Sequence, residues 1–78
     1  MRTVRVIWGQ RIRAARTGQH MSQVRLAAAM GVTQQVISKW ETGISSPADD
    51  RRPDLARVLG VPPDELFAYP ANGGEAAA

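Results

Sequence analysis

Apolar residues recur along the chain at spacings of three and four, the pattern of amphipathic helices, and glycines, prolines and short polar runs interrupt them. This pattern predicts an all-α fold of five short helices. The fifth and shortest is expected to begin near Pro63 and to end before Pro70, whereas the fourth begins at Arg52 or Pro53. The first four expected helices cover residues 8–17, 23–30, 34–42 and 53–59.

Glycines support these boundaries, because a glycine commonly caps the C-terminus of a helix. Four of the five expected helices are followed by one, at Gly18, Gly31, Gly43 and Gly60. We therefore expect one compact domain over residues 8–70. Residues 71–78 are small, with two glycines and three closing alanines, and are expected to form a disordered tail.

The segment before the first expected helix has a different pattern. Residues 3–7 are mostly β-branched and roughly alternate, which favours a short strand or an extended arm over residues 1–7. The alternative is that these residues lead directly into the first helix.

Residues 26–38 contain two helical patterns joined at a glycine. Gly31 permits the positive φ of a tight turn, and Ser22 and Thr33 are suited to cap the N-termini of the two helices. A helix, a short turn and a second helix form a helix-turn-helix, which places its second helix in the major groove of DNA. Here the second helix opens with Gln34 and Gln35, whose amides are suited to base edges.

The composition excludes several classes of protein. Seventy-eight residues suffice for one small domain. With no cysteine and a single histidine, His20, we expect neither a metal site nor a cofactor. No nucleophile–histidine–carboxylate set and no glycine-rich phosphate loop indicates an enzyme. No apolar run is long enough for a membrane span or a signal peptide, so we expect a cytoplasmic protein.

Charge is distributed unevenly along the chain. Residues 1–48 contain seven of the ten basic residues and only one of the seven acidic residues, Glu41. A basic N-terminal part and a mildly acidic C-terminal part suit a protein that presents one face to a polyanion. A mixed, solvated surface is the alternative interpretation.

Four segments together match a known family in their order and spacing. With them, the chain over about residues 8–69 resembles the λ-repressor-like (XRE/Cro) helix-turn-helix proteins, which include phage repressors and Cro proteins. The resemblance implies a compact five-helix DNA-binding domain with its helix-turn-helix at helices 2 and 3. It also implies a buried ion pair between Arg16 and Glu41. The matching segments are residues 9–16, 22–38, 40–43 and 55–61.

The expected base-reading residues lie on the exposed face of the second motif helix. A glutamine amide matches the N6 and N7 atoms of adenine, and such a contact contributes about 1–3 kcal/mol of discrimination. Gln34 is the first candidate, and the resemblance to phage repressors with the same Thr-Gln-Gln run supports it. Gln35 would reach the next base pair. Val36 would touch a thymine methyl or pack inward, and Ser38 and Lys39 lie one turn further, Lys39 contacting guanine or a phosphate.

Other polar residues are expected to contact the DNA backbone. The free N–H groups at the start of a helix bind anions, so the helix that begins near Ser22 and Gln23 can hold a phosphate. In the loop after the second motif helix, Arg51 and Arg52 would hold phosphates or instead neutralise nearby aspartates. The full set of expected backbone contacts is Gln23, Ser22, Thr33, Ser45, Ser46, Arg51, Arg52 and Arg11.

We expect a homodimer, because one half-site gives little specificity. The expected partner is double-stranded operator DNA with an inverted repeat, its half-sites about 10–10.5 base pairs apart. The expected dimer surface is Leu66, Phe67, Tyr69 and Pro70, although Leu66 and Phe67 are also suited to close the core. An alternative dimer element is the segment of residues 3–7, pairing as strands.

These residues together predict a sequence-specific transcriptional regulator, most simply a Cro-like repressor controlled by its own concentration. An antitoxin or a restriction controller would share every motif. A protein-interaction adaptor of the same fold is the hypothesis from another class, and the base-reading amides of Gln34 and Gln35 argue against it.

Overall fold

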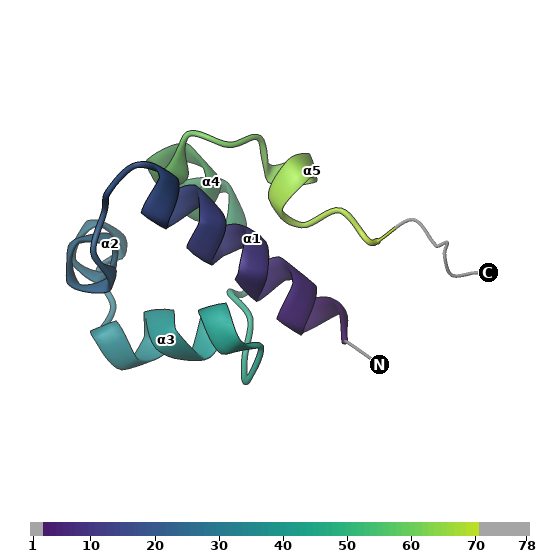
Figure 1. The fold of residues 1–78 in the computed structure, drawn as a ribbon, viewed down its shortest axis with the longest axis horizontal. Coiled ribbons are helices and arrows are strands. Elements are labelled where there is room, and N and C mark those ends of the chain that lie inside the picture. Colours follow the sequence, from purple (N-terminus) through teal and green to yellow (C-terminus); the bar gives the residue numbers. More distant parts are fainter. Residues whose placement is uncertain (1–2, 71–78) are drawn as a thin grey trace.

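The computed structural model describes residues 3–70, which form five helices and no strand (Figure 1). The all-α prediction is therefore confirmed, and the helix boundaries agree closely from α2 onward. Residues 1–2 and the tail predicted at 71–78 lie outside the described residues. The helices are α1 (Val4–Gly18), α2 (Gln23–Met30), α3 (Gln34–Thr42), α4 (Arg52–Leu59) and α5 (Pro63–Leu66).

Side chains and glycines fix the two motif helices at both ends. The hydroxyls of Ser22 and Thr33 accept hydrogen bonds from the backbone N–H groups of the third residue beyond, 3.0 Å and 3.3 Å away. Such caps satisfy backbone donors that a helix otherwise leaves free. At the turn between the helices, Gly31 has φ +69°, a conformation that strains any residue with a Cβ.

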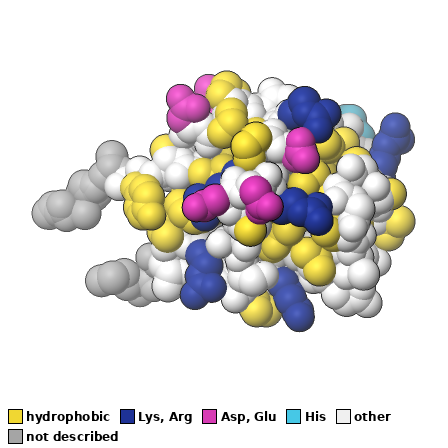
Figure 2. All heavy atoms as spheres, turned by 180° about the vertical axis from the view of Figure 1, so that it is seen from behind, with side chains coloured by type: hydrophobic (Ala, Val, Ile, Leu, Met, Phe, Trp, Pro, Cys, Tyr) yellow, Lys and Arg dark blue, Asp and Glu magenta, His cyan; other side chains and the backbone are white. Residues whose placement is uncertain are grey.

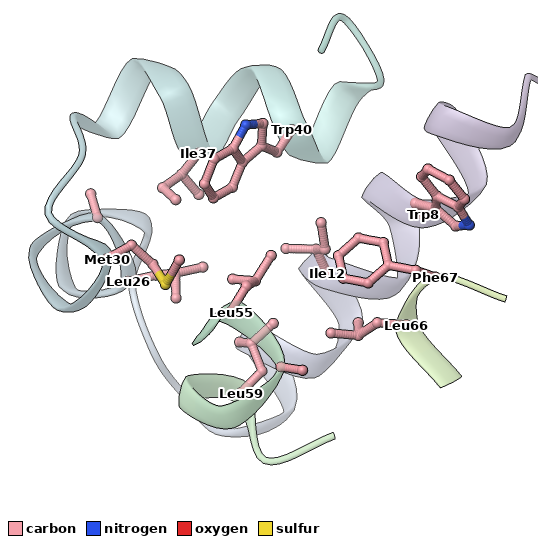
Figure 3. Close-up of a cluster of buried hydrophobic side chains, with 12 residues drawn as sticks. Trp8, Ile12, Leu26, Met30, Ile37, Trp40, Leu55, Leu59, Leu66 and Phe67 are labelled. Carbon is pink, nitrogen blue, oxygen red and sulfur yellow. The ribbon is translucent and has the colours of Figure 1, made fainter. Parts of the chain in front are cut away.

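The core is formed by one buried residue set to which all five helices contribute (Figure 3). Ile12, Leu26, Ile37, Leu55 and Leu66 are completely buried, one from each helix. Each helix thus contributes at least one side chain to the interior. No helix within the described residues is long and apolar enough to cross a membrane.

The prediction of an arm or strand was wrong for residues 4–7, which form the first turn of α1. The hydroxyl of Thr3 caps this turn by accepting from the Val6 N–H, and Val4 packs against the core. Val6 also lies against the C-terminus of α3, because a Cβ on Gly43 would come within 2.8 Å of the Val6 Cα. A cap and two tertiary contacts therefore override the weak helix propensity of the β-branched residues.

α1 and α3 approach each other closely through Gly9. A Cβ at this position would lie 2.4 Å from the carbonyl oxygen of Trp40 and 2.5 Å from that of Glu41, closer than nonbonded atoms approach. Only a residue without a side chain lets the two helix backbones pack at this distance. Gly9 thereby sets the position of α3 on the domain.

Candidate nucleic-acid interface

One face of α3 presents polar side chains to solvent. Gln34, Gln35 and Lys39 are exposed, whereas Val36 and Ser38 are half-buried. On the opposite side of the helix, Ile37, Trp40 and Glu41 are buried. The five residues expected to read bases thus differ in accessibility, and Val36 packs against the core. Its inward packing is the alternative that the sequence left open.

A hydrogen-bonded chain of polar side chains links this surface to the interior. Glu41 and Arg16 expose only 7% and 8% of their surfaces, and Nη2 of Arg16 donates to Oε1 of Glu41 over 3.0 Å. Nε of Arg16 donates to the other carboxylate oxygen. Nε2 of Gln23 donates to Oε1 of Glu41 over 3.0 Å, and Nε2 of Gln34 donates to Oε1 of Gln23 over 3.3 Å.

The Arg16–Glu41 pair joins the C-terminal part of α1 to α3, as the family resemblance implied. The third guanidinium nitrogen of Arg16, Nη1, donates a hydrogen bond to the backbone carbonyl of Met21 and so anchors the segment before α2. The hydrogen bonds from Arg16 to Glu41 raise the pKa of the guanidinium, against the opposing effect of burial. Arg16 therefore stays protonated. The pair fixes α1, α2 and α3 relative to one another.

The four hydroxyls expected to contact phosphates lie at helix starts or in the loop after α3. Ser22 and Thr33 are exposed at the N-termini of α2 and α3, where their oxygens already accept capping hydrogen bonds. Ser45 and Ser46 are half-buried in this loop. At the start of the loop, the N–H groups of Ile44 and Ser45 donate to the Lys39 carbonyl. Thr33 and the loop thus flank α3 along the chain.

Two of the arginines expected to bind phosphate donate to groups of the chain itself, and Arg52 pairs with an aspartate, the alternative that the sequence left open. Arg11 donates to the backbone carbonyls of Glu65, Leu66 and Ala68, and so satisfies the C-terminus of α5. Arg52 forms an ion pair with Asp49 over 3.2 Å and donates to the Pro47 carbonyl.

The guanidinium of Arg52 also stacks on aromatic rings. Its central carbon lies 4.7 Å from the ring centre of Trp8 and 5.1 Å from that of Phe67. A contact of this kind stabilises by about 0.5–1 kcal/mol at exposed sites and more when desolvated. Arg51 differs, since it is exposed and donates to the Met30 carbonyl at the end of α2, beside the turn of the motif.

The expected dimer surface is divided by the structure. Leu66 is completely buried and Phe67 nearly so, and both belong to the core, which corrects their assignment to an exposed contact. Tyr69 exposes 75% of its surface and Pro70 is exposed. The Tyr69 ring packs edge-on against Trp8, with ring centres 5.5 Å apart.

Acidic and basic side chains occupy different parts of the molecule. Figure 2 shows acidic side chains in the upper and middle parts of the face behind Figure 1, toward α4 and α5. The charged side chains along its lower edge, where α3 runs, are basic. Glu41 is the one acidic residue before Asp49, and it is buried. Among the described residues, the charged side chains on the surface of α1–α3 are therefore all basic.

The sequence did not indicate the Gln23–Glu41 contact or the close approach at Gly9. The first joins residues 18 positions apart through side-chain geometry that no periodicity encodes. For Gly9, the one signal was a glycine inside a helical pattern, which often marks a close backbone approach.

An all-helical domain with a capped helix-turn-helix, and with exposed amides on its second helix, defines a DNA-binding module. The family described as Helix-turn-helix matches residues 12–66 of the chain. An uncharacterized HTH-type transcriptional regulator of Sinorhizobium fredii is 41% identical over 64 residues, covering 82% of this chain and 45% of that protein. The 26 kDa repressor protein of Escherichia phage HK022 is 40% identical over 55 residues, covering 70% of this chain and 23% of that protein.

Solved structures show the same fold. The P22 c2 repressor in complex with a synthetic operator is similar with a TM-score of 0.76 and 32% identity, over 80% of this chain and 94% of that one. The restriction-modification controller C.AhdI of Aeromonas hydrophila is similar with a TM-score of 0.73 and 34% identity, over the same shares. The chain belongs to the helix-turn-helix family of DNA-binding transcriptional regulators, and it spans about half the length of the first curated relatives it matches.

Proposed function

We propose that the protein is a sequence-specific regulator that binds double-stranded DNA through α3 in the major groove and represses transcription by occupying its operator. The observation that carries this proposal is the amide of Gln34, exposed in the first turn of α3 and held by Gln23. A fixed amide at the start of a recognition helix is the group that reads adenine through its N6 and N7 atoms.

The other α3 side chains extend the contact along the groove. Gln35 follows Gln34 and reaches the neighbouring base pair, while Lys39, one turn further, contacts guanine or a phosphate. Ser38 supports this edge as a half-buried hydroxyl. Val36 reaches at most one thymine methyl, because it packs partly against the core.

Groups around α3 hold the DNA backbone. The free N–H groups of the first turn of α2, beside Ser22 and Gln23, form an anion site of the kind that binds phosphate. Thr33, Ser45 and Ser46 add hydroxyls, and Arg51 adds an exposed charge. Such contacts position the protein on DNA without reading sequence.

The protein acts as a homodimer on an inverted repeat. Tyr69 and Pro70 form the exposed apolar end of the domain that a second copy covers, with Leu66 and Phe67 supporting them from the core. Half-site centres then lie about one helical turn apart, roughly 10–10.5 base pairs. Strand pairing through residues 3–7 is not proposed, since α1 includes four of these residues.

Binding selection from a random duplex library at physiological salt tests the proposal. An enriched inverted repeat with this half-site spacing is expected, and sedimentation of the protein on the selected duplex should show two copies. Removal of the Gln34 amide in Gln34→Ala should cost about 1–3 kcal/mol at one base pair of each half-site. Weak, salt-sensitive binding without enrichment would contradict the proposal and favour a protein-interaction adaptor.

A restriction controller is a second candidate, because the structure of C.AhdI is similar over 80% of the chain. Its operator would lie beside genes for a methyltransferase and an endonuclease. Mapping of the selected site in the source genome distinguishes this role from that of a phage-type repressor.

A further inference from the structure

We propose that the buried carboxylate of Glu41 sets the direction of the Gln34 amide, and thereby selects the base that Gln34 reads. The inference rests on the proposed function and deepens it. Its basis is the hydrogen-bonded chain from the buried Glu41, through the half-buried Gln23, to the exposed Gln34. Glu41 would act as a positioning residue, since Gln23 and Gln34 separate it from the surface.

The direction of the chain follows from the chemistry at its buried end. Both oxygens of Glu41 accept hydrogen bonds from Arg16, and an ionised carboxylate can only accept. Gln23 must therefore turn its NH2 group toward Glu41, which leaves its carbonyl oxygen facing Gln34. Gln34 in turn must donate to that oxygen. An isolated glutamine amide has no such constraint, because a half-turn exchanges its donor and its acceptor.

This direction determines what Gln34 offers to DNA. One N–H of Gln34 is bound to Gln23, so one N–H and the carbonyl oxygen remain. A donor beside an acceptor complements the N7 acceptor and the N6 donor of adenine. The reversed amide would bind Gln23 through its oxygen and present two donors, which suit the N7 and O6 acceptors of guanine. Glu41 thus favours adenine over guanine at this base pair.

The variant Glu41→Gln tests the inference, because a glutamine can both donate and accept and no longer fixes the direction. Equilibrium binding is measured on the selected operator and on the duplex with adenine replaced by guanine at the Gln34-dependent position. The preference for adenine should fall about five-fold or more, corresponding to the lower end of a bidentate contact. Preferences at the other base pairs should stay as in the wild-type protein.

The matched control is Arg16→Lys, which weakens the same buried pair but keeps the accepting carboxylate. This variant should lose stability and retain the preference for adenine. A second comparison uses Gln23→Met, which interrupts the chain. In that background Glu41→Gln should change the preference no further, because coupled residues are not additive.

Unchanged preference in Glu41→Gln, or an equal loss in Arg16→Lys, would overturn the inference while the selected operator still supported the proposed function. Circular dichroism verifies that each variant is folded. If Glu41→Gln alone fails to fold, the double variant Arg16→Met/Glu41→Gln removes the stranded charge and makes the same test. A library without an enriched site would overturn the proposed function and this inference with it.

Discussion

A single methyl group at Gly9 tests how α3 is held on the domain. In Gly9→Ala, the new Cβ would lie 2.4 Å from the Trp40 carbonyl oxygen and 2.5 Å from that of Glu41. Since favourable contact begins near 3.5 Å, α3 would have to move by about 1 Å. The obstructing atoms belong to helical backbone, which cannot rotate away as a side chain would.

The cost follows from this geometry. Overpacking of a core costs about 1–3 kcal/mol and occasionally more, and a backbone clash belongs at the upper end, about 3 kcal/mol. A single core in a domain of this size rarely supplies more than about 3–5 kcal/mol in total. Gly9→Ala should therefore lose most of the free energy of unfolding.

Urea unfolding, followed by circular dichroism and tryptophan fluorescence, measures this loss. Gly18→Ala is the matched control, because it lies in the same helix and its Cβ would meet nothing within 4 Å. Alanine in a helix is favoured over glycine by about 0.5–1 kcal/mol, so the control should gain stability. Equal effects of the two substitutions would refute the close approach of α1 and α3.

The remaining predictions concern three other parts of the fold. Arg16→Met should lower the free energy of unfolding in urea by about 3–5 kcal/mol, because it strands the buried charge of Glu41, and adding Glu41→Gln should recover part of the loss; no recovery would contradict the pair. Leu66→Ala should lower the free energy of unfolding, measured by thermal unfolding, by about 2–5 kcal/mol, as expected of a core residue. An unchanged stability would contradict the burial of Leu66. Arg52→Ala should cost about 1 kcal/mol and shift the fluorescence of Trp8, and an unchanged spectrum would argue against stacking.

The sequence was sufficient for α2, α3 and the turn between them, because their signals are local. Ser22 and Thr33 mark the helix starts, Gly31 marks the turn, and the apolar spacing indicates the buried face. The first turn of α1 could not be predicted, because Val4 and its neighbours depend on contacts with residues distant in sequence in addition to the Thr3 cap.

The candidate site divides in the same way. The exposure of Gln34 and Gln35 follows from helical periodicity, so the sequence indicated them as surface residues. The arginines could not be assigned by charge, since a guanidinium binds whichever carbonyl, carboxylate or ring the fold brings within reach. Arg11 reaches carbonyls at the end of α5, and Arg52 reaches Asp49 and two aromatic rings.

Parallel binding selections with the wild-type protein and Gln34→Ala test the central claim, base reading by α3, most directly. The wild-type protein should enrich an inverted repeat, and the variant should enrich the same repeat without the adenine preference at one position of each half-site. Identical repeats from both proteins, or no repeat from the wild-type protein, would contradict base reading by α3.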